Sequence, residues 1–397
     1  MRNKFVYQPP ANGYPEWNNN PDVFQLNRME AHASMMPFLT LSEALIGDHS
    51  ASPYYRSLNG IWKFAFAETP DQRIQAFYQS DYDCSEWVDM PVPSHWQLQG
   101  YDYPQYTNIR YPWSALEPDL KAPFAPTAYN PVGSYVRTFK VPEAWRDQPV
   151  FISFQGVESA FYIWINGELV GYSEDTFTPA EFDITPYLTD GENKLAVEVY
   201  RWCDASWLED QDFWRLSGIF RDVYLYTAPS LHIADFFVRT NLDAEYRDAE
   251  LQLDVKLANY ANLTVDAITV EAQLYDSDKR AILEQPISMT ASFRGENDRS
   301  IELSTIVANP LLWSAEMPHL YTLVISLIDK DGKLLELVSC RTGFRRFELK
   351  DGLMKINGQR IVFKGVNRHE FSPDTGRALS KEDMVRDIQL MKAYNVN

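Results

Sequence analysis

Alternating apolar and polar positions predict short β-strands over most of the chain. The runs Glu250–Leu257 and Thr322–Ile328 alternate in this way, which is typical of antiparallel strands with one buried face. Phe161–Ile165 leads directly into Asn166-Gly167, a dipeptide that favours a tight hairpin turn. Many short strands separated by turn residues predict a mainly β protein that contains sandwiches.

The pattern divides the chain into four parts, of which the last begins at residue 346. Residues 1–52 are rich in proline and asparagine and show little periodicity, so we predict an extended N-terminal arm that lies on other parts of the protein. Residues 53–228 predict one β-sandwich of many short strands. Residues 231–345 predict a second, immunoglobulin-like β-sandwich.

The period changes after residue 346. The apolar run Ile361–Gly365 predicts a strand, and Ser380 with Asp383 predicts the capping box of a helix with one apolar face, at Met384, Ile388 and Met391. Two turn signals precede the strand, at Asp351-Gly352 and Asn357-Gly358. A strand, a loop and a helix, followed by Val396 at the start of another strand, predict the first β/α unit of a (β/α)₈ TIM barrel. Such a barrel needs about 250 residues, so we expect this one to remain incomplete within residues 346–397.

Composition narrows the function classes. The net charge of −19 argues against nucleic acid or an anionic membrane as a partner, and a hydrophobic content of 45% argues against disorder. No apolar run is long enough for a membrane helix. The three cysteines are widely spaced and odd in number, which favours a reducing compartment. We therefore expect a cytoplasmic protein.

The stretch Leu208–Val223 carries the densest candidate chemistry. It combines four carboxylates, two arginines and three aromatic residues within sixteen positions. Aromatic faces beside hydrogen-bonding carboxylates suit a polyhydroxylated ring such as a sugar. The alternative is an ion-paired strand end in which Arg215 and Arg221 neutralise the acids.

Several runs of this sequence resemble the large bacterial β-galactosidases of glycoside hydrolase family 2. The resemblance begins in the run Asp210–Val223 and covers nearly the whole chain in the correct order. The other runs that carry it are Phe24–Arg28, Arg56–Gly60, Pro93–Gln97, Tyr106–Asn108, Trp313–Glu316 and Gly365–Glu370.

The resemblance implies a jelly-roll sugar-binding domain, an immunoglobulin-like domain and the truncated start of a TIM barrel. It also implies hydrolysis of terminal β-D-galactosyl residues, as in lactose, with retention. Retaining hydrolysis uses two carboxyl groups. In the family both are glutamates on late barrel strands, beyond Asn397. We therefore predict that this chain supplies substrate-binding residues, is inactive alone, and requires the remainder of the barrel and the C-terminal domains. The full-length form is expected to be a homo-oligomer.

Two alternatives remain open at this point. The related family 2 glycosidases β-glucuronidase and β-mannosidase share the same domain order. A glucuronidase would need cationic groups for the carboxylate of its substrate. The chain could also serve as a non-catalytic carbohydrate-binding or complementing fragment.

By resemblance, three residues contact the galactosyl group: Asn108, Asp212 and His369. His369 would stabilise the transition state, and Asp212 would also ligate a sodium ion (Na⁺). Asn108 and His369 each retain a plain structural interpretation, as a turn residue and a packed histidine. The resemblance further implies a structural Mg²⁺ held by the arm and by an Asp after an Arg-Trp pair, here at Glu16, Asn20, Glu174 and Asp204. Without it, the arm residues read as a solvated turn.

Overall fold

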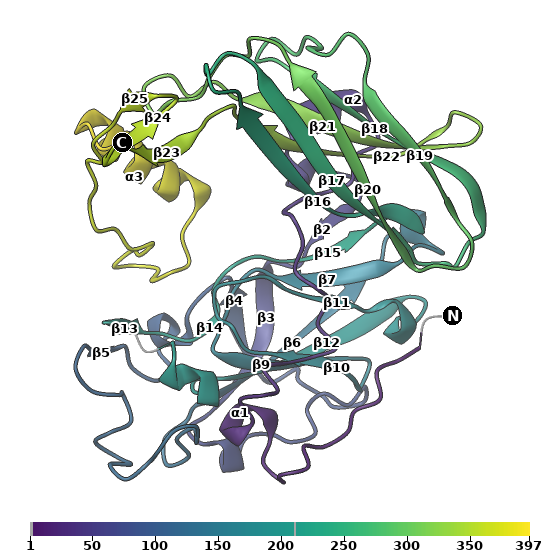
Figure 1. Cartoon of the computed structure of the whole chain (residues 1–397). Helices are drawn as coiled ribbons and strands as arrows, with labels where there is room; N and C mark the ends of the chain where they lie inside the picture. The colour runs from purple at the N-terminus through teal and green to yellow at the C-terminus, as the bar shows by residue number, and fades with distance from the viewer. Residues whose placement is uncertain (1–2, 210–211) are drawn as a thin grey trace. The chain divides into compact units, whose positions relative to one another are not determined.

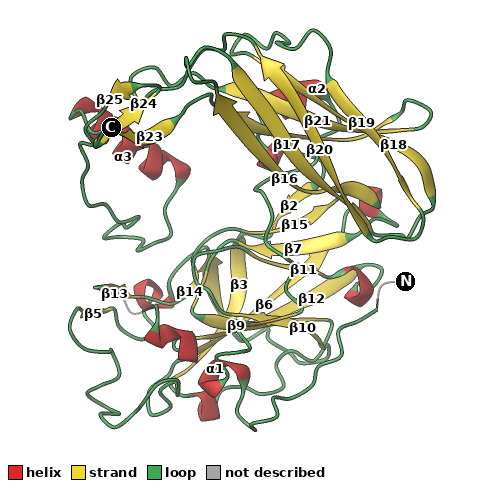
Figure 2. Cartoon of the chain, viewed as in Figure 1, coloured by secondary structure: helices red, strands yellow, loops and turns green. Residues whose placement is uncertain are grey.

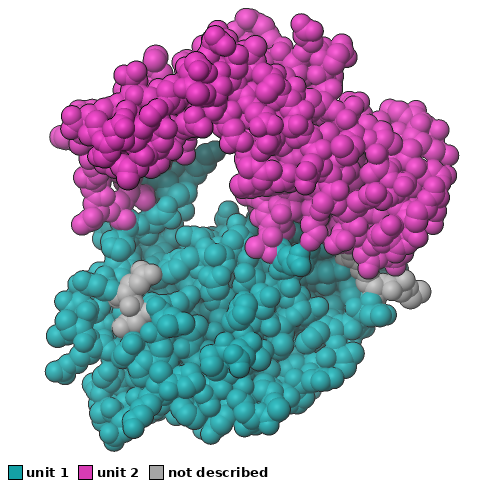
Figure 3. Space-filling view, viewed as in Figure 1, with its two compact units in different colours: residues 1–30, 56–226, 369–384 teal, residues 31–55, 227–368, 385–397 magenta. Residues whose placement is uncertain are grey.

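The computed structural model describes residues 3–209 and 212–397, and the chain forms two compact units (Figure 3). Unit 1 comprises the described parts of residues 1–30, 56–226 and 369–384, and unit 2 comprises residues 31–55, 227–368 and 385–397. Each unit is described by itself. Asp210 and Gln211, the first two positions of the run that carries the resemblance, lie outside the described residues.

Unit 1 is built on a β-sandwich (Figures 1 and 2). Within the described ranges, its larger sheet has the order β1 (Gln25–Leu26), β10 (Glu168–Ser173), β9 (Ala160–Ile165), β12 (Glu192–Tyr200), β6 (Val132–Lys140), β3 (Gly60–Ala67) and β4 (Val88–Val92). The smaller sheet has the order β11 (Ala180–Asp183), β7 (Val150–Phe154), β15 (Val223–Thr227) and β2 (Tyr55–Ser57). Ile152 of β7, Ile163 of β9 and Val197 of β12 belong to one buried cluster, so the two sheets pack face to face.

Two short ribbons stand outside the main sheets of unit 1. β5 (Gln105–Thr107) pairs with β13 (Phe213–Arg215), and β8 (Val157–Glu158) pairs with β14 (Gly218–Ile219). Both ribbons use the stretch Leu208–Val223. That stretch therefore becomes a pair of short strands that reach back to loops of the sandwich.

The arm departs from the predicted extended form. It contains α1 (Glu16–Asn19) and α2 (Leu41–Ile46), and β1 joins the large sheet through β10. Helix α2 forms because Thr40 and Glu43 complete a capping box and Gly47 ends the helix in the left-handed region. The remaining short helices are 3₁₀ turns: η1 (His49–Ala51), η2 (Pro70–Gln72), η3 (Trp96–Gln99), η4 (Glu143–Trp145), η5 (Thr185–Tyr187) and η6 (Asp204–Trp207).

Unit 2 contains the second sandwich. One sheet has the order β16 (Leu231–Leu242), β17 (Ala249–Asn259) and β20 (Asp298–Val307). The facing sheet has the order β19 (Ile287–Phe293), β18 (Val265–Tyr275), β21 (Tyr321–Asp329) and β22 (Leu334–Thr342). The alternation in β17 is realised as predicted, because Leu251, Leu253 and Leu257 are buried in the core.

The last fifty residues match the prediction only in part. β23 (Phe347–Lys350), β24 (Leu353–Ile356) and β25 (Gln359–Arg360) form a meander whose turns lie at the two predicted Gly-containing dipeptides. Helix α3 (Lys381–Ala393) begins at the predicted capping box, since the Asp383 amide donates to Ser380 Oγ at 3.1 Å. No residue of α3 is buried, so its predicted apolar face is uncovered.

The predicted strand Ile361–Gly365 is wrong for this structure. The run has no regular strand, and Val362 and Phe363 are each 57% exposed. A barrel strand is stabilised by parallel neighbours on both sides. Here the Ile361 amide donates to the Met354 carbonyl at 3.0 Å and the Asn397 amide donates to the Lys364 carbonyl at 3.1 Å, and these contacts do not make the run a strand of a sheet. The predicted strand at Val396 is absent for the same reason.

Across the residues that the structure describes, none of the helices has the length and apolar character needed to span a membrane.

Gly133 of β6 provides a test of the packing in unit 1. A Cβ atom there would lie 2.6 Å from Trp96 Cζ3 and 2.8 Å from Phe64 Cε2, both buried rings. We expect Gly133→Ala to lower the free energy of unfolding by about 1–3 kcal/mol, because the rings cannot move without disturbing the core. Urea unfolding followed by near-ultraviolet circular dichroism measures it.

Gly365→Ala is the control, since a Cβ there meets no atom within 4 Å. Equal unfolding midpoints for the two variants would contradict the predicted overpacking.

Candidate functional site

The ribbon of β5 and β13 brings two predicted sugar-binding residues together. The strands pair antiparallel with Thr107 opposite Phe213, so Asn108, which follows β5, and Asp212, which precedes β13, lie at the same end of the ribbon. Both residues are exposed. The Tyr106 hydroxyl donates to Asp212 Oδ1 at 2.6 Å and holds the carboxylate in place.

The third predicted residue reaches the same end through an aromatic contact. His369 is exposed, and its ring stacks on Phe213 with centroids 4.2 Å apart and an interplanar angle of 22°. Phe371 meets the same ring edge-on at 5.2 Å. Asn108 and Asp212 therefore share one end of the ribbon, and His369 lies against Phe213, the chain neighbour of Asp212, although the three residues lie far apart in the sequence.

This arrangement offers the chemistry of a sugar pocket. A carboxylate accepts hydrogen bonds at up to about four positions, so Asp212 can accept from hydroxyls while it keeps the bond from Tyr106. The Asn108 amide both donates and accepts, and a histidine ring does the same when neutral. Partly exposed Tyr106 and Trp214 supply the apolar surface nearby.

Three of the four acids of Leu208–Val223 lie among the described residues, and the fourth, Asp210, lies outside them. Glu209 accepts from the Thr176 hydroxyl at 2.8 Å, and Asp222 accepts from the Asn59 amide at 2.7 Å. With Tyr106 on Asp212, each of these carboxylates has an uncharged donor.

His95 fixes the neighbouring part of this stretch. The Arg377 amide donates to His95 Nε2 at 3.1 Å, so Nδ1 carries the proton and donates to the Ser217 carbonyl at 3.2 Å. Burial, and next the positive charge of Arg377, lower the pKa of His95 from 6.5 to about 3, while the bond to Ser217 opposes this shift. The neutral His95 ring thus has a structural role, because it joins Ser217 to Arg377 through its two hydrogen bonds.

The predicted magnesium residues separate into two groups. Ligand atoms of Glu174, Asp204 and the thiol of Cys203 all lie within 4.8 Å of one another, and all three residues are buried. The backbone N–H of Asn20 donates to Asp204 Oδ2 at 2.7 Å, while the Asn20 side-chain amide donates to the carbonyls of Tyr14 and Pro15. The Glu16 carboxylate lies outside this group and accepts from the hydroxyls of Tyr7 and Tyr162.

The electrostatics of this group fit a cation. Burial, and then the charge of Asp204, raise the pKa of Glu174 to about 9, and burial also raises the pKa of Asp204. Asp204 Oδ1 is buried and has no hydrogen-bond partner among the described residues. Two adjacent buried carboxylates and an orphaned oxygen suit a hard divalent cation.

Asp212, the residue predicted to ligate Na⁺, is an exposed carboxylate in the structure. Within residues 3–209 and 212–397, one group of acidic, histidine or cysteine side chains could hold a metal ion: Glu174, Cys203 and Asp204. Asp212 is not part of that group.

Sequence reasoning missed four residues around the candidate sugar site. Tyr106, Phe213 and His95 lay inside the runs that carried the resemblance, so their motifs were visible but not their roles. Arg377 had no motif signal at all. Its contacts with His95 and Glu158 follow from the path of the chain alone.

Three family descriptions match consecutive parts of this chain. The description "Glycosyl hydrolases family 2, sugar binding domain" matches residues 55–229, "Glycosyl hydrolases family 2" matches residues 231–345, and "Glycosyl hydrolases family 2, TIM barrel domain" matches residues 347–397. Together with the two sandwiches, these matches confirm the predicted fold class: mainly β, with the start of a TIM barrel domain.

Curated relatives with high identity are named β-galactosidases. The protein of Priestia megaterium is 58% identical over 99% of this chain, and that of Halalkalibacterium halodurans is 49% identical over 96%. The chain spans only 38% and 36% of the lengths of these two relatives.

Among solved structures, the chain is similar to β-glucuronidases of Bacteroides uniformis. One, β-glucuronidase 2 bound covalently to cyclophellitol-6-carboxylate aziridine, has a TM-score of 0.72 and 26% identity over 86% of this chain and 39% of that chain. Another has a TM-score of 0.73 and 25% identity over 86% of this chain and 38% of that chain.

Within the candidate site, His95 gives a pH-dependent prediction. Its pKa is lowered from 6.5 to about 3 on folding, so below pH 6.5 the unfolded chain takes up a proton that the folded chain does not. The stability that depends on neutral His95 is complete above pH 6.5 and falls as the pH drops toward 3, by up to about 1.4 kcal/mol per pH unit. Urea unfolding of the chain at several pH values measures this slope.

His95→Gln is the matched variant, because its amide does not titrate. The difference in unfolding free energy between the chain and the variant should shrink as the pH falls. A difference that stays constant from neutral pH to about pH 4 would contradict the prediction.

Proposed function

Because the chain belongs to glycosyl hydrolase family 2, we propose that it provides the galactosyl-binding part of a retaining β-galactosidase that cleaves terminal β-galactosides such as lactose. The observation that carries the proposal is that Asn108 and Asp212 share one end of the ribbon while His369 lies against Phe213. The identity to named β-galactosidases supports the same substrate.

The three side chains have complementary roles in this proposal. Asp212, oriented by Tyr106, accepts from sugar hydroxyls, and charged acceptors make the stronger hydrogen bonds. Asn108 contacts the same sugar from the neighbouring strand end. His369 stacks on Phe213, and in this proposal its ring nitrogens would stabilise the charge distribution of the transition state.

We assign no acid/base and no nucleophile to this chain. Retaining hydrolysis requires two carboxyl groups about 5 Å apart on either side of the scissile bond. By resemblance these are barrel glutamates of the whole protein. The residues described here bind and orient the sugar.

The charges around Phe213 favour a neutral galactoside over a glucuronide. A glucuronide carries a carboxylate, which needs a cation that is not already neutralised. Arg377 pairs with Glu158 at 2.5 Å, and Arg221 lies 3.7 Å from Glu370. Asp212 adds a negative charge at the site and would repel the carboxylate of a glucuronide.

Hydrolysis of three nitrophenyl glycosides by the full-length protein tests the function. We expect turnover of the β-galactoside well above that of the β-glucuronide and β-mannoside, and no turnover by residues 1–397 alone. Asp212→Asn should lower kcat/KM for the galactoside by about 100-fold, because it removes a charged acceptor from the sugar contact.

Asp266→Asn is the control, since Asp266 forms an exposed ion pair with Arg294 in unit 2. Preference for the glucuronide or the mannoside would replace the proposed substrate. If galactose bound but the full-length protein hydrolysed none of the three, the non-catalytic carbohydrate-binding alternative would hold.

We also propose that Glu174 and Asp204 bind a structural Mg²⁺, with Asn20 orienting Asp204 and Glu16 fixed nearby by its tyrosine contacts. The ion would neutralise the two adjacent carboxylates and join the arm to the sandwich. For Na⁺, Asp212 is the proposed ligand from this chain.

Removal of the metal tests the magnesium proposal. A chelator should lower the Tm of the chain, and Mg²⁺ should restore it, with a gain of about 2.7 kcal/mol at a hundredfold excess over Kd. Asp204→Asn should abolish the response. Glu198→Gln, which alters a buried glutamate paired with Arg73, should lower Tm but keep the response to Mg²⁺. Equal responses from both variants would rule the site out.

The thiols support a reducing, cytoplasmic location, since Cys84, Cys203 and Cys340 are all free. We propose that the full-length protein is a homo-oligomer, and its mass by sedimentation equilibrium decides this.

A further inference from the structure

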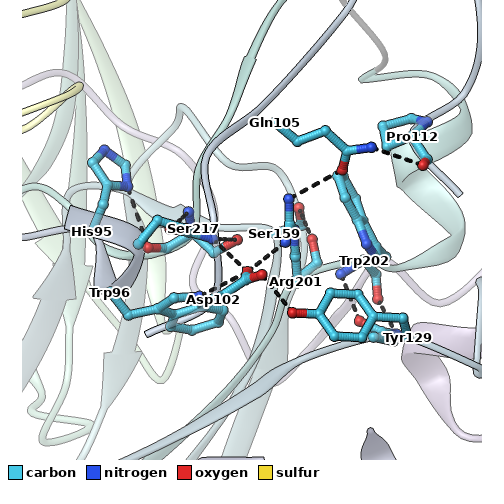
Figure 4. Close-up of polar contacts among 12 residues, drawn as sticks. His95, Trp96, Asp102, Gln105, Pro112, Tyr129, Ser159, Arg201, Trp202 and Ser217 are labelled. Carbon is cyan, nitrogen blue, oxygen red and sulfur yellow. Dashed lines mark hydrogen bonds and ion pairs between the residues drawn. The ribbon is translucent and has the colours of Figure 1, made fainter. Parts of the chain in front are cut away.

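A continuous chain of hydrogen-bonded polar side chains, most of them buried, runs through unit 1 (Figure 4). We call it the buried polar chain, and its members are Gln105, Arg201, Asp102, Gln97, Ser217 and His95. One end lies beside the loop that carries Asn108. The other end contacts Arg377, in the segment that follows His369.

The first end fixes the loop of Asn108 on both sides. Gln105, on the strand before Asn108, donates through Nε2 to the Pro112 carbonyl at 2.9 Å, on the far side of the loop. Its Oε1 accepts from Arg201 Nη2 at 3.3 Å. Gln105 therefore closes the loop 105–112 and joins it to Arg201.

The centre of the buried polar chain is an ion pair. Arg201 Nη1 donates to Asp102 Oδ2, and the two side chains are 1% and 0% exposed. Gln97 Nε2 donates to the same carboxylate oxygen at 3.0 Å, and Tyr129 donates to the other oxygen at 2.6 Å. Both carboxylate oxygens of Asp102 and both terminal nitrogens of Arg201 thus have hydrogen-bond partners, which restricts the geometry of the buried pair, while Arg201 Nε is without a partner among the described residues.

From Gln97 the buried polar chain passes into the stretch Leu208–Val223. Gln97 Oε1 accepts from the Ser217 amide at 2.8 Å, and His95 Nδ1 donates to the Ser217 carbonyl at 3.2 Å. Gln97 and His95 thus bind both backbone polar groups of Ser217, two residues beyond the end of β13. This sets the position of the strand that carries Asp212 and Phe213.

The second end holds the segment after His369. Arg377 donates its amide to His95 Nε2 at 3.1 Å and its guanidinium to Glu158 Oε2 at 2.5 Å. Its guanidinium also lies 5.0 Å from the Phe213 ring centroid. Gly376 approaches so closely that a Cβ would lie 2.7 Å from His95 Cδ2. The segment from His369 to Arg377 is therefore tied to the ring on which His369 stacks.

We infer that the buried polar chain, together with Arg377, positions the loops of Asn108 and His369 as one unit, so that Arg377 and Gln97 are positioning residues for the galactosyl site. This inference rests on the proposed function for its catalytic consequence. Its structural consequence is that the loops of Asn108 and His369 are coupled through the buried polar chain. That coupling does not depend on any activity.

Hydrogen exchange on residues 1–397 tests the coupling without any substrate. Gln97→Leu keeps the side-chain volume close and removes the central hydrogen bonds. We expect faster exchange in both 106–111 and 369–376, with β6 and β12 unchanged. Exchange that is unaltered in either loop, or accelerated equally across unit 1, would overturn the inference.

Kinetics of the full-length protein test the consequence for the site. Arg377→Gln should lower kcat/KM for a nitrophenyl β-galactoside by about 10-fold to 100-fold, since a displacement of about 1 Å has this effect on an oriented group. Arg377→Lys should recover part of the loss, because it keeps the charge opposite Glu158.

Arg73→Gln is the matched control, because it also leaves a buried carboxylate, that of Glu198, without its ion pair. It should lower Tm but change kcat/KM less than about threefold. Equal kinetic losses from Arg73→Gln and Arg377→Gln would show a general loss of stability and overturn the inference. If the unaltered full-length protein hydrolysed no galactoside, the proposed function would fail, and the exchange experiment would still decide the positioning role.

Discussion

The buried ion pair between Arg201 and Asp102 is the constraint on which the site in unit 1 depends. Moving both charges out of water is costly, and a buried pair contributes little net stability compared with apolar packing. Its geometry, however, is demanding, because Tyr129, Gln97 and Gln105 make further hydrogen bonds to the same two side chains. The aromatic ring of Trp202 lies 4.8 Å from the guanidinium and completes its surroundings. The pair therefore specifies one arrangement of the loops around it.

The same fold serves enzymes with different sugars, so the sugar must be argued from the site. The β-glucuronidases of Bacteroides uniformis share the architecture with this chain at 25–26% identity. The discriminating feature is charge. In the proposed function, the pairing of Arg377 with Glu158 and of Arg221 with Glu370, together with the negative charge of Asp212, would favour a neutral sugar over an anionic one.

The acidic group at Glu174 and Asp204 shows a different use of buried charge. At the candidate sugar site the Asp212 carboxylate accepts from the Tyr106 hydroxyl, whereas here two carboxylates lie together and Asp204 Oδ1 is without a hydrogen-bond partner in the described part of the chain. Burial penalises both ionised forms, which raises both pKa values. A bound cation would reverse that penalty, and this is the physical basis of the magnesium proposal.

Local pattern was sufficient for much of the fold. The alternation in Glu250–Leu257 determined β17, since side chains alternate across a strand, and Asn166-Gly167 determined a hairpin because both residues adopt positive φ readily. Ser380 and Asp383 determined the start of α3 through a hydrogen bond between residues that are three positions apart in the sequence. The resemblance of several sequence runs to glycoside hydrolase family 2 identified the family, and the matched domain descriptions confirm it.

Tertiary structure decided the rest. Ile361–Gly365 has the composition of a strand, but a strand exists only with partners, and pattern cannot supply them. The sequence named Asn108, Asp212 and His369 separately. Only the pairing of β5 with β13 and the stacking of His369 on Phe213 bring them together, across more than a hundred residues in each case. Arg377 carried no signal in the sequence, because its role comes entirely from the groups that the folded chain places around it.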